Sequence, residues 1–416
     1  MLLVRSFQKT TMNSLRRFIR NLGPGLVTGA ADNDPSGIST YSIAGARVGY
    51  SLLWLSLFTL PMTIAVQGMA AKVGLVTRHG LAAVIRRHYP RWVLYVAATL
   101  LVVSNIPIIA ADLLGVAAGL NLLLPALPII SYVIPIAFLI LLVEVLENYQ
   151  NLARALKWLT LIFFAYVAAG FLAHPDWTAV LRGTFVPHLE WSKSFIAIVV
   201  ALLGTTITPY LFFWQSSEEV EELHAKRGGQ SIRNMLIDVN AGMVFLHLIF
   251  FFIMLTTAST LFTTGQDIQT AGDAAAALKP IAGDASSALL AIGLIGAGLL
   301  AIPVLTGSTA FVLAETFGWK EGFEQRVRKA PGFYATLTIA MALGVALALS
   351  GISVIEALFY SQVLAGIIAP ILLVLLLRIC NDRKIMGRHV NGWFFNVFGT
   401  VTIAIMAATA AALFIV

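Results

Sequence analysis

Long apolar stretches separated by short polar or basic segments extend from residue 22 to the end of the chain. A helix needs about 20 apolar residues to cross the hydrocarbon core of a bilayer. The pattern therefore predicts about eleven membrane-spanning helices. Their predicted ranges are 22–47, 50–73, 93–122, 129–147, 155–173, 195–219, 236–263, 286–316, 333–350, 354–379 and 393–415.

Two of these predicted helices are interrupted by a proline among polar residues. The first break is Asp32-Asn33-Asp34-Pro35-Ser36-Gly37, and the second is Thr205-Thr206-Ile207-Thr208-Pro209-Tyr210. Proline removes a backbone donor and disfavours helical geometry in the residue before it. Inside a membrane, such irregular backbone is tolerated only where it is buried in protein or lines a cavity.

The positions of the breaks predict an internal repeat. The spans divide into five, five and one, and each break lies in the first helix of a set of five. An odd number of helices per repeat inverts the second repeat relative to the first, which is the plan of transporters with a substrate site at the bilayer midplane. We predict an all-α membrane protein with an N-terminal segment 1–21, repeats 22–174 and 195–380, and an eleventh helix at 393–416.

Composition and charge agree with a multi-pass membrane protein. Of the 416 residues, 59% are hydrophobic and 11% are charged, against roughly 25% charged residues in soluble domains. With a cytoplasmic N-terminus, all Lys and Arg residues except Arg47, Arg182, Lys193 and Lys279 fall on cytoplasmic segments. This bias predicts insertion in the cell (inner) membrane with an extracellular C-terminus. The net charge of +7 therefore indicates topology and lipid contact, with no nucleic-acid partner.

Other classes of chemistry leave no signature. The single Cys380 cannot form a disulfide within the chain. There is no GxxxxGK[ST] loop, HExxH motif or nucleophile elbow in the sequence. We expect neither an enzyme nor a bound cofactor, and no obligate protein partner is indicated.

The first break predicts a cation site. Asp34 places a carboxylate at membrane depth, where charge is costly and usually functional. Freed carbonyls near Ala31 and Thr205, the hydroxyl of Thr208 and the amide of Gln362 would complete an oxygen-rich set of ligands. The alternatives are that Asp34 only caps the second half-helix and that Gln362 only bonds a neighbouring helix.

Four further residues are candidates for the path of the ion. Asp32 and Asn33 either add negative field at the mouth of the site or cap a half-helix. Asp112 in the third span either joins a proton or ion path or pairs with a neighbouring helix. Tyr210 is favoured as a packing residue, although its position beside Pro209 keeps it among the candidates for the path.

Several motifs resemble the Nramp family of divalent-metal transporters over nearly the whole chain. The matching segments are Gly23-Pro24-Gly25, Asp34-Pro35, Gly45-Ala46-Arg47-Val48-Gly49-Tyr50, Ala111-Asp112-Leu113-Leu114-Gly115, Leu120-Asn121, Ser361-Gln362-Val363 and Asp382-Arg383-Lys384-Ile385-Met386-Gly387. The resemblance implies a LeuT-like fold with broken first and sixth helices, and a divalent metal as transported substrate.

The chain departs from the family pattern at the site itself. The family motif Asp-Pro-Gly-Asn stands here as Asp34-Pro35-Ser36-Gly37, and Met-Pro-His stands as Thr208-Pro209-Tyr210. A second family His is Gln215 here, and an acidic position of the third span is Ile109. The chain thus resembles the Nramp-related magnesium transporters, a branch thought to lack proton coupling. Because Gly37 and Thr208 are small, we also expect more room for water ligands.

These observations predict import of divalent cations by alternating access. A site without a thioether favours Mg²⁺, with Mn²⁺ also carried, and the lost His positions predict transport without proton coupling. One alternative is a proton-coupled Mn²⁺/Fe²⁺ transporter that uses Asp34 and Asp112. The other is an amino-acid or small organic-solute transporter of the same helical plan, against which the charge of Asp34 argues.

Overall fold

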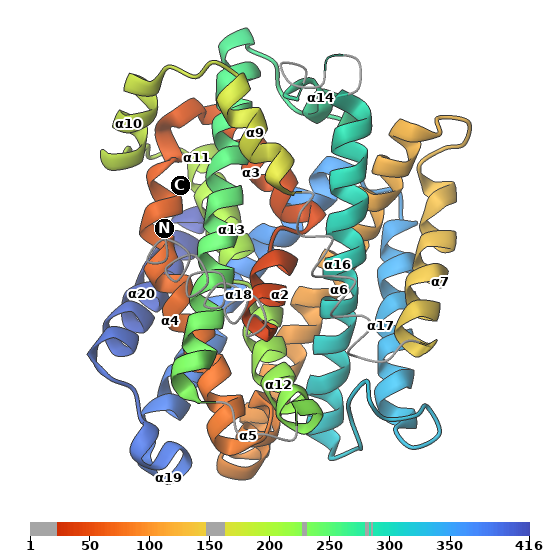
Figure 1. Ribbon diagram of the computed structural model, residues 1–416, viewed down its shortest axis with the longest axis vertical. Coiled ribbons are helices and arrows are strands. Elements are labelled where there is room, and N and C mark those ends of the chain that lie inside the picture. Colours follow the sequence, from red (N-terminus) through yellow and green to blue (C-terminus); the bar gives the residue numbers. More distant parts are fainter. Residues whose placement is uncertain (1–22, 147–162, 227–230, 279–282, 284–285) are drawn as a thin grey trace, which may run out of the picture.

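The computed structural model describes residues 23–146, 163–226, 231–278, 283 and 286–416, and this part of the chain is helical without strands. The helices run roughly parallel to the long axis of the molecule (Figure 1). We name its two ends after short helices: the α5 end, which also holds α19, and the α14 end, which also holds α10 (Figure 1). The predicted segment 1–21 lies outside the described residues.

The first ten described elements cover the chain up to the first half of the sixth span. They are α2 (Pro24–Ala31), α3 (Pro35–Val48), η1 (Gly49–Leu52), α4 (Trp54–Thr77), α5 (Leu81–His88), α6 (Arg91–Leu123), α7 (Ile130–Leu146), α9 (Phe164–Leu172), α10 (Trp177–Phe185) and α11 (Lys193–Thr206).

The remaining elements run from the second half of the sixth span to the C-terminus. They are α12 (Pro209–Lys226), α13 (Ile232–Thr260), η3 (Phe262–Thr264), α14 (Ala271–Ala276), α16 (Ser286–Phe317), α17 (Pro331–Ala348), α18 (Val354–Asn381), α19 (Arg383–Met386), η5 (Gly387–His389) and α20 (Trp393–Ile415).

The predicted spans coincide with these helices. Within the described residues, eight helices are long and apolar enough to cross a membrane, with the broken α11–α12 counted as one. The predicted first span is the broken pair α2–α3, and α7 is a shorter apolar helix. Of the predicted fifth span, residues 155–162 lie outside the described part, and α9 covers the rest. The prediction of an all-helical membrane fold is confirmed.

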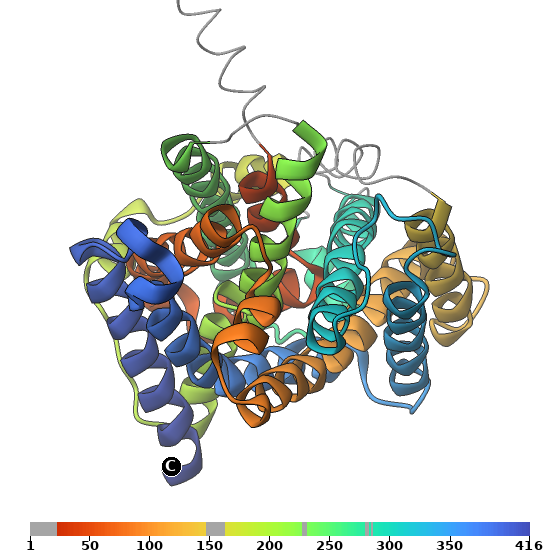
Figure 2. The ribbon, with the colours of Figure 1, turned by 90° about the horizontal axis from the view of Figure 1, so that it is seen from below.

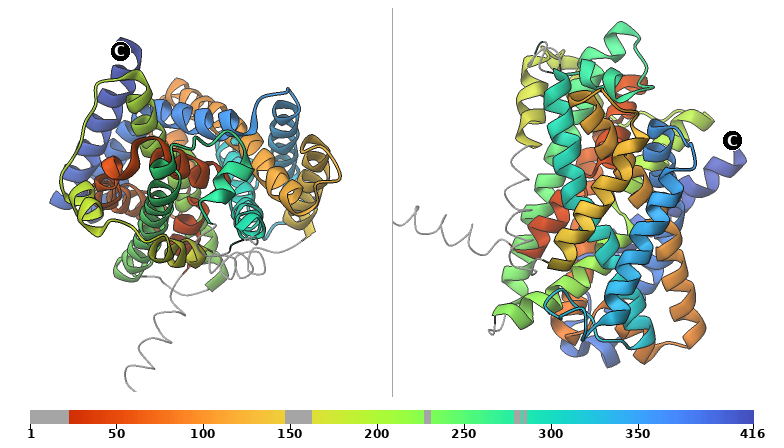
Figure 3. Two further views of the ribbon diagram at one scale, coloured as in Figure 1. Left: turned by 90° about the horizontal axis from the view of Figure 1, so that it is seen from above. Right: turned by 90° about the vertical axis from the view of Figure 1, so that its right-hand side faces the viewer.

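The outer helices expose apolar side chains, whereas the central helices bury polar ones. Seen along the long axis, α20 lies on one side of the molecule and α7 with α17 on the other (Figures 2 and 3). These outer helices expose large apolar residues such as Phe138, Ile339 and Phe414, as expected of surfaces that face lipid. The broken helices bury acids and hydroxyls, among them Asp34 and Thr208.

The first broken helix is fixed to α13. A Cβ on Gly29 would lie 2.1 Å from the carbonyl oxygen of Gly242, so only glycine permits the two backbones to approach this closely. The carboxylate of Asp238 on α13 accepts from the backbone N–H groups of Gly23 (2.8 Å) and Gly25 (2.7 Å). These donors have no partner within the helix, so Asp238 caps α2 from outside.

Candidate metal site

Both predicted breaks interrupt their helices in the structure. Helix α2 ends at Ala31 and α3 begins at Pro35, whereas α11 ends at Thr206 and α12 begins at Pro209. The carbonyls of Ala31 and Thr205 would each accept from the residue four positions on, which is a proline without an N–H. Each break therefore frees one carbonyl oxygen, four residues before its proline.

The carboxylate of Asp34 caps α3 and faces the second break. Its Oδ1 accepts from the backbone N–H of Gly37, as an N-cap residue does. Its other oxygen, Oδ2, lies 3.4 Å from the hydroxyl of Tyr210. The same hydroxyl lies 3.3 Å from the freed carbonyl oxygen of Ala31. The capping interpretation is thus correct for one oxygen only, and the second oxygen remains directed at α12.

The structure brings Asp32 into the same group. Thr208 Oγ1 donates to Asp32 Oδ1 over 3.2 Å, while Asp32 Oδ2 has no partner among the described residues. Asp32 is 1% exposed, so its charge acts in a low-dielectric environment. Asp32 is both the C-cap residue of α2 and a neighbour of Thr208 at the second break, so it has features of both interpretations left open by the sequence. Asn33 instead donates back to the carbonyl of Gly29 (3.3 Å).

Oxygen atoms converge beside Gly37. A Cβ built on Gly37 would lie 2.9 Å from the Asp32 carbonyl oxygen, 2.9 Å from Thr205 Oγ1 and 3.1 Å from Asp34 Oδ1. The absence of a side chain therefore lets oxygens from α11 and the first break meet at one point. Directly at Gly37 the packing is tight, because chain oxygens lie close to where a side chain would begin. The expected room for water ligands stays a prediction.

Asp112 on α6 is connected to the first break. Its Oδ1 accepts from both the hydroxyl (2.6 Å) and the backbone N–H (3.2 Å) of Ser36, and Asp112 is fully buried. The N-terminus of α3 thus carries two carboxylates, Asp34 and Asp112, where the helix dipole favours negative charge. Sequence reasoning missed the role of Ser36, since nothing local marks a partner 76 positions away.

Gln362 lies on α18 where that helix meets α11. A Cβ on Gly204 would lie 2.0 Å from the Gln362 carbonyl oxygen, so α18 packs closely on the last turns of α11. The side-chain amide of Gln362 is fully buried, and neither its oxygen nor its nitrogen has a partner among the described residues. The alternative of a helix-to-helix hydrogen bond from this amide is not found there.

The site offers oxygen ligands only. Asp32, Asp34, Thr205, Thr208 and Tyr210 are each at most 1% exposed, so the group is closed to both ends of the bundle. The described residues contain no group of three or more His, Cys, Asp or Glu arranged to hold a metal. Carboxylate, carbonyl and hydroxyl oxygens suit Mg²⁺, Ca²⁺ and Mn²⁺, whereas thioether and thiolate suit softer metals.

The helical bundle with two facing breaks defines a multi-pass membrane protein whose buried site lies between two interrupted helices. The family model described as natural resistance-associated macrophage protein-like (Nramp) matches residues 25–416. The chain belongs to the Nramp family.

Curated relatives of this chain are named divalent metal cation transporter MntH. The protein of that name from Bacillus subtilis is 26% identical over 95% of this chain and 92% of its own length. The one from Deinococcus radiodurans is 29% identical over 95% of this chain and 89% of its own length. These relatives are transporters by name, and their names describe no enzyme.

Solved structures share the fold at low identity. The manganese transporter of Eremococcus coleocola, solved with an aromatic bis-isothiourea compound, gives a TM-score of 0.74 at 20% identity, covering 95% of this chain and 86% of that one. Mhp1, a nucleobase-cation-symport-1 family transporter in a closed conformation, gives 0.59 at 12% identity over 95% and 91%. The fold is thus the LeuT-like one expected from the resemblance.

Proposed function

We propose that this protein imports divalent metal cations by alternating access, that Mg²⁺ is its main substrate and that Mn²⁺ is also carried. The observation that carries the proposal is the convergence of two carboxylates, Asp32 and Asp34, with freed carbonyls and hydroxyls between the two helix breaks. A charge of −2 from these carboxylates would balance one divalent cation. The same charge would repel the carboxylate of an amino acid.

The proposed ligands follow from the free oxygen atoms. Asp34 Oδ2 would be the central ligand, because Oδ1 is already used by the backbone of Gly37. The carbonyl of Ala31 shares the Tyr210 hydroxyl with Asp34 Oδ2 and would be a further ligand. The hydroxyl of Thr208 and one oxygen of Asp32, which contact each other, would join them. Thr205 and Gln362 complete the set from α11 and α18, and Gly37 leaves the space in which these oxygens meet.

The hardness of this set supports Mg²⁺ as substrate. Mg²⁺ is held by oxygen and usually keeps several waters, because it dehydrates reluctantly. A site with Thr208 in place of a thioether gives later transition metals no soft ligand. Since chain oxygens fill the space beside Gly37, we propose a partly dehydrated ion.

The driving force would be the electrochemical gradient alone. The membrane potential contributes about 2.3 kcal/mol per charge per 100 mV, hence about 4.6 kcal/mol for a divalent ion. Tyr210 and Gln215 stand at the two positions where a proton-accepting His occurs in the resemblance, which supports uptake without proton coupling.

One observation favours a second candidate, a proton-coupled Mn²⁺ transporter. Ser36 connects Asp112 to the helix that Asp34 caps, so a second carboxylate is coupled to the site by a hydrogen bond. Buried carboxylates of this kind form proton relays in pumps and transporters. The MntH names of the relatives agree with this candidate.

Topology completes the proposal. Basic residues such as Arg86, Arg326 and Arg383 lie in the segments that connect helices at the α5 end, whereas Arg47, Arg182 and Lys193 lie at the α14 end. By the positive-inside rule, the α5 end would face the cytoplasm of a cell with this protein in its inner membrane. The N-terminus would be cytoplasmic and the C-terminus extracellular. Residues 22–174 and 195–380 would form the two inverted repeats.

The experiment is uptake into proteoliposomes that contain a Mg²⁺ dye and a pH dye, with a potassium diffusion potential negative inside. We expect Mg²⁺ entry that increases with the potential and is not accompanied by acidification. Mn²⁺ entry with acidification and no Mg²⁺ entry would replace the proposal by the second candidate. No entry of either ion, while control liposomes remain sealed, would overturn both.

A further inference from the structure

A cavity lies away from the candidate metal site, at the α14 end. It measures about 610 Å³ and is bounded by α3, α11, α18 and α20. Two cations, Arg47 and Lys193, stand at its rim, while Ala197, Phe359 and Leu413 contribute to an apolar wall. None of the lining residues belongs to either helix break. The cavity therefore requires an explanation separate from that of the metal site.

The lining residues place the cavity at the depth where helices leave the bilayer. Arg47 lies in the last turn of α3, Lys193 is the first residue of α11, and Leu413 lies in the last turn of α20. Trp177 and Trp191, at the same end of the bundle, are exposed. Exposed tryptophans are typical of the interface between lipid tails and headgroups. The cavity therefore has its charged rim at headgroup level, and its apolar wall begins there with Leu413 and continues inward along α11 and α18 with Ala197 and Phe359.

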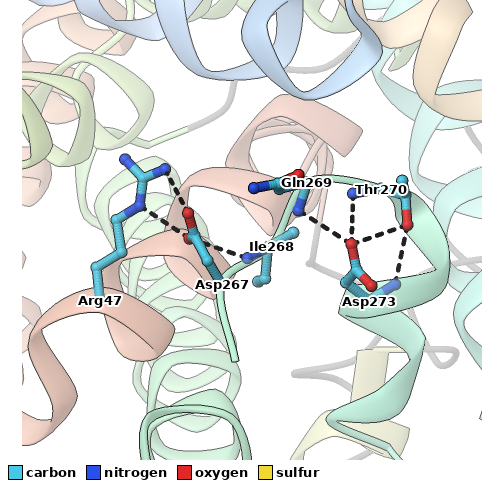
Figure 4. A network of polar contacts seen from close by, with 6 residues as sticks. All are labelled: Arg47, Asp267, Ile268, Gln269, Thr270 and Asp273. Carbon is cyan, nitrogen blue, oxygen red and sulfur yellow. Dashed lines mark hydrogen bonds and ion pairs between the residues drawn. The ribbon is translucent and has the colours of Figure 1, made fainter. Parts of the chain in front are cut away.

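Arg47 is held in place with donors to spare. Its Nε and Nη2 donate to the two carboxylate oxygens of Asp267 over 3.0 and 3.1 Å (Figure 4). The hydrogen bond from Arg47 lowers the pKa of Asp267, so this carboxylate stays ionised and the guanidinium stays oriented. A guanidinium has five N–H donors, so three are not used by Asp267.

Lys193 adds a second positive centre. Its side chain is exposed, and it begins α11, whose Ser192 cap accepts from the backbone N–H of Phe195. Lys193 is the first residue of α11, so its side chain starts at the positive end of the helix dipole. The dipole and the lysine charge both favour an anion there. The rim thus has cations on two different helices, with Asp267 as the partner of one of them.

We propose that this cavity binds one anionic phospholipid, with its phosphate between Arg47 and Lys193 and one acyl chain along Ala197, Phe359 and Leu413. Charge complementarity selects an anionic headgroup over a zwitterionic one, since juxtamembrane Lys and Arg attract anionic lipid. The apolar wall selects a lipid over a small soluble anion.

Occupancy of the cavity would act on the helices of the metal site. Asp34 caps the start of α3, Thr205 lies in the last turn of α11 and Gln362 lies within α18. All three helices also line the cavity. A lipid that contacts all of them adds binding free energy only to the arrangement in which they lie together. The bound lipid would therefore stabilise the closed arrangement described here.

The test is native mass spectrometry of the full-length protein with phosphatidylglycerol or phosphatidylethanolamine, together with thermal unfolding in the same lipids. We expect one tightly retained phosphatidylglycerol and a higher melting temperature with it. Lys193→Gln should weaken this binding about fivefold, the effect of one charge near a membrane surface. Ala197→Trp, which fills the apolar wall and keeps both cations, should abolish it.

Arg182→Gln is the matched control, because it removes an exposed cation of the same end that does not line the cavity. It should bind phosphatidylglycerol as the wild type does. Equal retention of the two lipids, unchanged binding in both Lys193→Gln and Ala197→Trp, or equal stabilisation by inorganic phosphate would each overturn the proposal. None of these outcomes depends on which metal is transported.

Discussion

The two helix breaks share one backbone feature and differ in their chemistry. Each frees a carbonyl four residues before a proline, at Ala31 and at Thr205. The first break adds the carboxylates of Asp32 and Asp34, whereas the second adds hydroxyls, of which those of Thr208 and Tyr210 contact the two carboxylates. The comparison suggests a division of roles: the first break supplies charge, and the second break decides which cation the charge accepts.

The largest expected effect is the loss of charge at the first break. Asp34→Asn keeps the size of the side chain and its ability to accept from Gly37, and removes the negative charge from the central ligand. We expect Mg²⁺ uptake to fall to the level of empty liposomes while the protein keeps its elution profile. Substantial uptake by this variant would show that Asp34 is only a helix cap.

Asp32→Asn tests whether the second carboxylate of the same break belongs to the site. The neutral amide of the variant can keep the contact with Thr208. The site then loses half of the negative charge proposed to balance the cation. Because groups that support a metal ligand typically contribute 10–100-fold to affinity, we expect the half-saturating Mg²⁺ concentration to rise by roughly ten- to hundredfold. An unchanged value would restrict the charge of the site to Asp34.

Thr208→Met tests the role given to the second break. The substitution adds a soft thioether without changing any charge, and should shift preference from Mg²⁺ towards Mn²⁺ and Cd²⁺. The measurement is competition between these ions for uptake. Thr208→Ala is the matched control and should lower uptake of Mg²⁺ and Mn²⁺ alike. If Thr208→Met kept the wild-type preference, selectivity would reside elsewhere.

Tyr210→Phe removes one hydroxyl from the second break and keeps the ring. The loss of one hydrogen bond is worth about 1 kcal/mol, so we expect a change of about fivefold in the half-saturating Mg²⁺ concentration. The direction is informative, because the hydroxyl lies against both Ala31 and Asp34. Weaker binding would make it a ligand, and tighter binding would make it a competitor for these oxygens.

The smallest effect concerns a carboxyl group outside both breaks. Burial, with Glu315 and Glu221 nearby, raises the pKa of Glu321 to about 9, in the segment between α16 and α17. The folded state then holds a proton that the unfolded chain releases near its usual pKa of about 4.3, so stability falls as pH rises from there to about 9. Glu321→Gln should flatten the melting temperature over this window and leave Mg²⁺ uptake unchanged.

The fold was predictable from the sequence because its cause is local. Runs of about 20 apolar residues require helices. Pro35 and Pro209 stand among polar residues, and this combination predicted the breaks, whereas Pro107 and Pro303 lie inside unbroken helices. The positions of Asp34, Thr208 and Ala31 at the breaks follow from the same local argument. The prediction of the fifth span can be compared with the structure only in part, because residues 155–162 lie outside the described residues.

The parts of the site that were not predictable depend on contacts across the fold. An aromatic residue in an apolar run is usually a packing residue, so the sequence kept Tyr210 among the candidates without indicating that its hydroxyl lies at Asp34. The link from Ser36 to Asp112 joins distant segments. The close approach of Thr205 Oγ1 to Gly37 comes from another helix. No periodicity along the chain encodes such packing.

The central claim, that the two breaks together form a hard, all-oxygen site, is tested most directly by competition for Mg²⁺ uptake in proteoliposomes with the wild-type protein. Unlabelled Mn²⁺ and Cd²⁺ are added in parallel at equal concentrations. The account predicts that Mn²⁺ competes with Mg²⁺ and that Cd²⁺, which prefers soft ligands, competes much less. Stronger competition by Cd²⁺ than by Mn²⁺ would contradict it and would require a soft ligand that the site as described does not contain.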